Sequence, residues 1–205
     1  LGYVLPYSIV AALLLAILAF TNLGLHLDGF ADTVDGLAGG ATADEKLRIM
    51  RDSSTGAIGV VSLFFILLVK YLAIYELPAG ARAEALILFP ASGRWAMVLM
   101  GSLSRYARKE GGLGEAYAGV RAVTLLTASL FISAISLLTL GVNSLFILAA
   151  LGLSVLLSAA FFRKTLGGVT GDVFGFQNEI AETFILLLIL STEGVFGWTQ
   201  RGYIL

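Results

Sequence analysis

Six stretches of about 20 apolar residues constrain the fold of this chain more than any other feature, because about 20 residues of helix cross the 30 Å hydrocarbon core of a bilayer. In lipid such a segment must be helical, since each backbone polar group needs a partner within the segment. We therefore predict an all-α fold, a polytopic transmembrane helix bundle with about six spans. The predicted spans are residues 4–24, 57–77, 84–103, 122–141, 144–162 and 180–198.

The composition agrees with a membrane protein. Hydrophobic residues make up 58% of the 205 residues and charged residues only 13%, and the mean hydropathy is +0.93, outside the range of soluble domains. A net charge of −1 gives no reason to expect nucleic-acid binding, and the lack of cysteine excludes disulfides and thiolate metal sites. We expect residues 1–205 to form a single integral-membrane catalytic domain, preceded by an additional N-terminal segment.

Alternation of the spans places three long connections, residues 25–56, 104–121 and 163–179, on one side of the membrane. These connections carry nine Lys or Arg residues, whereas the opposite side has Arg82 and Arg201. Because basic residues accumulate in cytoplasmic loops, the three connections are predicted to lie in the cytoplasm. Polar motifs in all three could then form one active site at an inner membrane.

An acidic stripe opens the first connection. In the run LHLDGFADTVDG, a helix would place Asp28, Asp32 and Asp35 at i, i+4 and i+7, on one face. Three like charges on one face repel each other and become tolerable around a divalent cation. Carboxylate ligands favour Mg²⁺, with Mn²⁺ as a substitute. The alternative is a solvated loop with incidental acidic residues.

A basic segment follows in ADEKLRIMRDSSTG. Arg48 and Arg51 could clamp a diphosphate, and Asp52 could be a fourth metal ligand or, with Asp35, a catalytic general base. Alternatively, Arg48 and Asp52 are an i, i+4 pair that stabilises a surface helix.

A second polar segment, residues 166–182, reads LGGVTGDVFGFQNEIAE. Its glycines could cradle phosphate or ribose, and its acidic and amide side chains are candidate substrate-binding groups. The alternative is a capped helix start with acids near the N-terminal dipole. The candidates are Asp172, Asn178, Glu179 and Glu182.

Two basic residues, Lys70 and Arg94, lie within predicted spans. A charge inside the membrane indicates a functional site by default, although Lys70 could instead reach the interface along its aliphatic stem. Arg94 is expected to pair with an acidic cluster or to bind a substrate phosphate.

Five motifs in order, HLDGFADTVDG, LRIMRDSSTGAIG, GRWAMV, YARKEGGLG and GGVTGDVFGFQNEIAE, resemble the cobalamin (5′-phosphate) synthase family, whose members are also called adenosylcobinamide-GDP ribazoletransferases. The resemblance covers nearly the whole chain. It implies a magnesium-dependent inner-membrane transferase of vitamin B12 (cobalamin) biosynthesis. Its substrates would be GDP-cobinamide and α-ribazole or α-ribazole 5′-phosphate, and GMP would be released.

Asp32, Asp35 and Gly36 also fit the DxxDG opening of the CDP-alcohol phosphotransferases, but Gly39 and Gly40 replace the Ala-Arg that should follow. The alternatives are therefore a CDP-alcohol phosphatidyltransferase-like lipid enzyme and, from another class, a divalent-cation transporter. The sequence is compatible with an oligomer and leaves open which form of ribazole is preferred.

Overall fold

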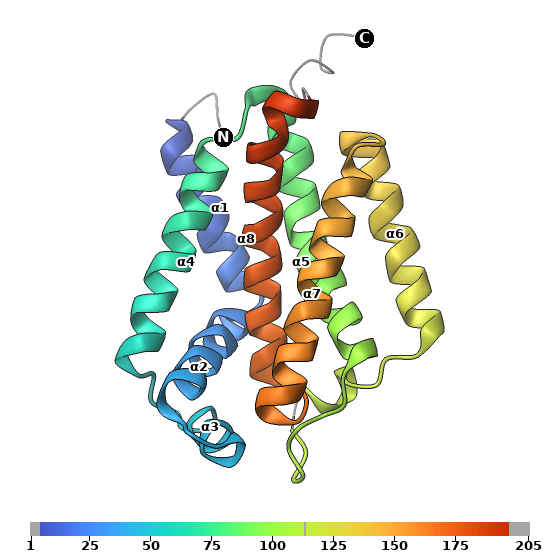
Figure 1. The fold of residues 1–205 in the computed structure, drawn as a ribbon. Helices are drawn as coiled ribbons and strands as arrows, with labels where there is room; N and C mark the ends of the chain where they lie inside the picture. Colours follow the sequence, from blue (N-terminus) through green and yellow to red (C-terminus); the bar gives the residue numbers. More distant parts are fainter. Residues whose placement is uncertain (1–4, 113, 197–205) are drawn as a thin grey trace.

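A computed structural model describes the backbone of residues 5–112 and 114–196, and the predicted all-α fold is confirmed (Figure 1). Two 3₁₀ turns, η1 (Ala79–Ala81) and η2 (Glu115–Tyr117), lie in connections. The helices are α1 (Tyr7–Thr21), α2 (Leu25–Gly39), α3 (Ala43–Ile49), α4 (Ala57–Tyr75), α5 (Arg82–Leu103), α6 (Ala122–Leu140), α7 (Ser144–Leu166) and α8 (Gly171–Phe196).

Helices α4 to α8 are each long and apolar enough to cross a membrane, which confirms a polytopic bundle. The first predicted span differs, because α1 is only 15 residues long and meets the test only together with α2, from which it is bent by 86°. Leu23 and Gly24 make this bend with positive φ angles of 53° and 73°. Helix α2 therefore turns across one end of the bundle.

Helix α8 is the central helix and packs against α2, α4, α5 and α7 (Figure 1). It begins at Gly171, so the predicted start at residue 180 is wrong. The least apolar spans are α5 and α8, with mean hydropathies of 1.4 and 1.6, and they are also the two most buried. Their polar side chains face protein partners rather than lipid, which explains why hydropathy underrates them.

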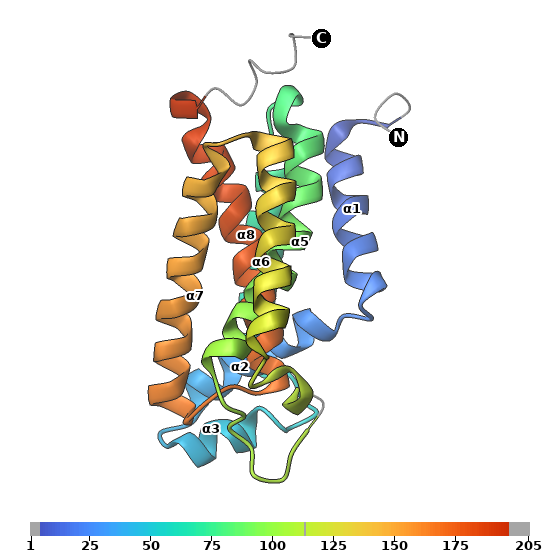
Figure 2. The same cartoon turned by 90° about the vertical axis from the view of Figure 1, so that its right-hand side faces the viewer.

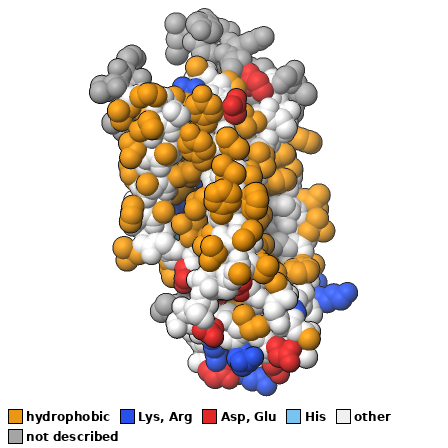
Figure 3. All heavy atoms as spheres, turned by 90° about the vertical axis from the view of Figure 1, so that its left-hand side faces the viewer, with side chains coloured by type: hydrophobic (Ala, Val, Ile, Leu, Met, Phe, Trp, Pro, Cys, Tyr) orange, Lys and Arg blue, Asp and Glu red, His pale blue; other side chains and the backbone are white. Residues whose placement is uncertain are grey.

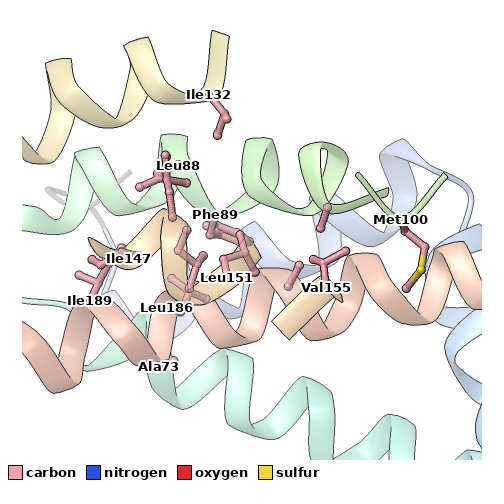
Figure 4. Close-up of a cluster of buried hydrophobic side chains, with 14 of the residues drawn as sticks. Ala73, Leu88, Phe89, Met100, Ile132, Ile147, Leu151, Val155, Leu186 and Ile189 are labelled. Carbon is pink, nitrogen blue, oxygen red and sulfur yellow. The ribbon is translucent and has the colours of Figure 1, made fainter. Parts of the chain in front are cut away.

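The apolar core lies between α5, α7 and α8 (Figure 4). Leu88 and Phe89 from α5 meet Leu151 from α7 and Leu186 from α8, and all four are buried. Helix α6 covers the outer side of α5 (Figure 2). The exposed apolar side chains of the spans face outward, where lipid would surround them, as Figure 3 shows for one side of the molecule.

The two ends of the bundle differ. Turns at residues 76–81 and 141–143 join helices at one end, whereas α2, α3, the segment 104–121 and the turn 167–170 meet at the other (Figures 1 and 2). Charged side chains of both signs gather there (Figure 3). We call it the polar end, and it contains the three long connections that the sequence predicts on one side of the membrane.

A buried charge network joins α4, α5 and α8 inside the bundle. The Lys70 ammonium group donates hydrogen bonds to Glu179 at 2.5 Å and to Glu182 at 2.8 Å. Arg94 forms an ion pair with the other oxygen of Glu182 and donates to Asn178 Oδ1 at 3.1 Å. The Asn178 amide in turn donates to Glu179 and Glu182.

Each carboxylate oxygen in this network has a partner, and two positive charges balance two negative ones. Lys70 is only 1% exposed and Glu182 is fully buried, so neither can exchange its partner for water. Burial of an ion is tolerated only under such conditions. The network therefore fixes how α4 and α5 sit against α8.

We expect Lys70→Met to lower the free energy of unfolding by about 3 to 5 kcal/mol, because Glu179 and Glu182 would stay buried with Arg94 as their one cation. In detergent the thermal midpoint should fall by about 10 °C. Lys164→Met, at an exposed position of α7, is the control and should change it little. The double variant Lys70→Met/Glu179→Gln should recover part of the loss, and a wild-type midpoint for Lys70→Met would contradict this account.

Candidate functional site

The acidic stripe lies on α2, so the predicted helix across LHLDGFADTVDG is confirmed. The helix begins after Gly24, which adopts the left-handed conformation, and ends at the extended Gly40. The carboxylates of Asp28 and Asp32 make no hydrogen bond or ion pair with other residues that the structure describes. Their carboxylates are therefore available to a ligand at the polar end.

Glycines bring α2 and α8 into backbone contact beside this stripe. A Cβ atom on Gly29 would lie 2.9 Å from the Asp172 backbone, and one on Gly175 would lie 2.9 Å from the His26 carbonyl oxygen. Larger residues would force the helices apart. The glycines of the second polar segment thus allow close packing, and they place Asp172 next to the stripe.

Electrostatic effects of this crowding are seen at Asp32. Burial raises its pKa to about 7, and the negative charges of Asp28, Asp172 and Asp35 add to the increase, while Arg108 opposes it. A carboxyl group with this pKa is only partly ionised at neutral pH. The site therefore has an excess of negative charge that a bound cation would relieve.

Asp35 has a different environment. Its two carboxylate oxygens accept hydrogen bonds from the backbone N–H groups of Gly56, at 2.7 Å, and Gly59, at 2.8 Å. These groups belong to the first turn of α4, so Asp35 caps a helix that follows it in the chain. The sequence predicts a metal ligand and catalytic role for Asp35 but gives no sign of this cap.

Helix α3 begins with a capping box between Thr42 and Glu45 and ends at Ile49. Asp52 lies beyond that end, so the helical Arg48–Asp52 pair considered from the sequence does not form. Its carboxylate accepts hydrogen bonds from the Ser54 hydroxyl, at 2.6 Å, and the Ser54 N–H, at 3.0 Å. These bonds lower the pKa of Asp52, whereas a general base works best with a pKa near the working pH.

Arg108 is a site residue that counts in the sequence only as one of the nine basic residues of the three long connections. Its guanidinium donates a hydrogen bond to Asp172 at 2.6 Å, and Thr170 donates to the same oxygen at 3.2 Å. Pairing of Tyr106 with Val169 holds the two segments together. A basic run opposite an acidic, glycine-rich run was the available signal, but the pair is 64 residues apart.

The other predicted substrate-binding residues occupy two places. Arg48 and Arg51 lie at the outer surface of the polar end, where Arg51 pairs with Glu110 at 2.7 Å. The remaining ones, Arg94, Asn178, Glu179 and Glu182, form the buried network with Lys70.

Arg94 differs from its partners because its side chain is partly exposed, with 42% of its surface accessible. The expectation that it pairs with acidic residues is confirmed by its ion pair with Glu182.

His26, the single histidine, is 3.3 Å from the Asn22 amide and lies on α2, the helix that carries the acidic stripe.

The carboxylates of Asp28, Asp32 and Asp172 are suitable ligands for Mg²⁺ but do not surround a metal ion by themselves. Within residues 5–112 and 114–196, no three acidic or histidine side chains converge closely enough to hold a metal ion by themselves. Mg²⁺ is commonly bound by one or two carboxylates together with substrate phosphates. Asp28 and Asp32, with Asp172 beside them, fit that mode, in which the substrate completes the coordination.

Comparison with known proteins identifies the family. The cobalamin-5-phosphate synthase family matches residues 1–190. The adenosylcobinamide-GDP ribazoletransferase of Desulforamulus reducens is 40% identical over 177 residues, covering 86% of this chain and 71% of the relative. The enzyme of the same name from Geotalea daltonii is 36% identical over 96% of this chain and 79% of its own length. The one from Syntrophobacter fumaroxidans is 38% identical over 91% of this chain and 75% of its own length.

No solved structure matches the chain. The sequence matches nevertheless extend over the acidic stripe, the basic segments and the polar start of α8. This chain therefore belongs to the cobalamin-5-phosphate synthase, or adenosylcobinamide-GDP ribazoletransferase, family.

Proposed function

We propose that this chain joins GDP-activated adenosylcobinamide to α-ribazole or α-ribazole 5′-phosphate, with release of GMP. The observation that carries the proposal is that Asp32 lies within electrostatic reach of Asp28, Asp172 and Arg108 at the polar end of a membrane bundle, in a chain of this family. Carboxylates that attract a cation and a guanidinium that attracts phosphate are the groups a diphosphate substrate requires.

In the proposed reaction the ribose hydroxyl of ribazole attacks the phosphorus atom attached to cobinamide. A new P–O bond forms to the ribose oxygen, the P–O bond to the GMP phosphate breaks with its oxygen leaving on GMP, and the hydroxyl proton is released to solvent. Mg²⁺, or Mn²⁺ in its place, would neutralise the phosphate oxygens as charge moves to the leaving group. Asp28 and Asp32 would hold the metal, and Arg108 would steady Asp172 and approach the phosphates.

Asp35 and Asp52 were also candidates for the proton acceptor and for metal ligation. Both already accept hydrogen bonds, Asp35 from the start of α4 and Asp52 from Ser54. Asp28 and Asp32 are free of such bonds in the described structure. We therefore assign them the main role and regard Asp35 as the residue that fixes α2 against α4.

We place the polar end in the cytoplasm of a cell with an inner membrane, because its connections carry most of the basic residues. A transporter is disfavoured because Lys70 and Arg94 are both ion-paired with Glu182, so that these three residues offer no row of free charges along the described helices. The lipid-enzyme alternative shares the metal chemistry, and a substrate assay separates it from the proposed reaction.

The first test is turnover by the purified protein in liposomes with GDP-cobinamide and α-ribazole or its 5′-phosphate. We expect magnesium-dependent formation of GMP and the cobalamin product in equal amounts. Asp32→Asn should lower kcat by at least about 100-fold, because it removes one charged ligand from the metal.

Glu76→Gln, at an exposed position in the turn at the opposite end of the bundle, is the control and should keep most of the activity. If a folded wild-type protein forms no product with either ribazole, the proposed function is wrong. CDP-alcohols and then cation flux would be tested next.

Metal affinity should also depend on pH. The metal binds the ionised form of Asp32, so a pKa of about 7 in the metal-free protein predicts about tenfold weaker binding at pH 6 than at pH 8. Mn²⁺ titration followed by electron paramagnetic resonance measures this directly. The Asp32→Asn variant should bind Mn²⁺ more weakly than the wild type, with little difference in affinity between pH 6 and pH 8. Equal wild-type affinities at the two pH values would exclude Asp32 as a metal ligand with this pKa.

A further inference from the structure

A basic cavity of about 270 Å³ lies at the outer surface of the polar end, between α3 and the segment 104–121. Basic side chains in its wall outnumber acidic ones four to two. Leu47 and Ala107 add apolar surface. The charged residues are Asp44, Arg48, Arg51, Arg108, Lys109 and Glu110.

Two of the four cations form no ion pair in the described part of the chain. Arg51 pairs with Glu110 and Arg108 pairs with Asp172. The side chains of Arg48 and Lys109 make no hydrogen bond or ion pair with described residues and attract nearby carboxylates only at longer range. Anchoring at a membrane surface would explain basic residues anywhere at this end. It does not explain why cations from two distant segments converge on one cavity.

The cavity is connected to the acidic site through Arg108. This residue lines the cavity while one of its terminal nitrogens donates to Asp172, and its buried Nε has no hydrogen-bond partner in the described structure. A phosphate in the cavity would therefore lie one side chain away from the carboxylates. Arginine is well suited to this position because its planar group binds phosphate oxygens in pairs.

We propose that this cavity binds the phosphate of a nucleoside monophosphate through Arg48, Lys109 and Arg108. The proposal rests on the proposed function, which supplies two sources of this group: GMP, which leaves, and α-ribazole 5′-phosphate, which enters. The size of the cavity suits a phosphate with part of its nucleoside. The Leu47 and Ala107 surfaces would contact that nucleoside.

The test measures binding of GMP and of α-ribazole 5′-phosphate to the full chain in detergent, with guanosine and α-ribazole as phosphate-free counterparts. Arg48→Gln and Lys109→Gln should each weaken binding of a phosphorylated ligand about tenfold and leave its counterpart unchanged. Arg163→Gln is the matched control, because Arg163 lies at the same end but lines a separate cavity with Arg105.

A selective loss for GMP would assign the cavity to the leaving group, and a selective loss for α-ribazole 5′-phosphate would assign it to the acceptor. Unchanged affinities for both, or an equal loss in Arg163→Gln, would overturn the proposal. Because binding needs no turnover, the two proposals fail separately. If the wild-type protein is active but the Arg48→Gln and Lys109→Gln variants bind both ligands normally, only the cavity proposal is wrong. If the wild-type protein is inactive but these variants show the selective loss of binding, only the proposed reaction is wrong.

Discussion

The ion pairs of Lys70 and Arg94 with Glu179 and Glu182 are the interaction on which the rest of the structure depends. Charges inside a membrane are stable only when they meet each other, so these residues dictate that α4 and α5 flank α8. That arrangement brings the start of α8 to the polar end, where Asp172 meets α2. The position of the acidic site thus follows from a network deeper in the membrane.

The division between interior and polar end also separates two kinds of charged residue. Inside, each carboxylate oxygen has a partner and the charges balance. At the polar end, the side chains of Asp28 and Asp32 form no hydrogen bond or ion pair with described residues, and neither do those of Arg48 and Lys109. Unpaired charges of opposite sign at neighbouring positions suit a metal and a phosphate that bind together.

Much of the fold could be predicted from the sequence because lipid imposes it: long apolar segments must be helices, and α4 to α7 lie close to their predicted ranges. The spacing of Asp28 and Asp32 likewise predicted a common helix face. The start of α8 was missed because glycines 171 and 175 read as loop residues, whereas both lie in the helix and Gly175 permits its contact with α2. The Arg108–Asp172 pair and the buried partners of Arg94 depend on tertiary contacts between distant segments, which no local pattern reveals.

The cap that Asp35 provides for α4 has a consequence for genetics. Replacing this aspartate would remove hydrogen bonds from a helix start, a loss typically worth about 0.5 to 2 kcal/mol, and would also loosen the helix that carries the acidic stripe. An inactive Asp35 mutant found in a growth screen would therefore report misplacement of its neighbours as readily as loss of a ligand. Only Asp35 variants whose side chain still accepts hydrogen bonds from the N–H groups of Gly56 and Gly59 would distinguish a structural role of this residue from metal binding or catalysis.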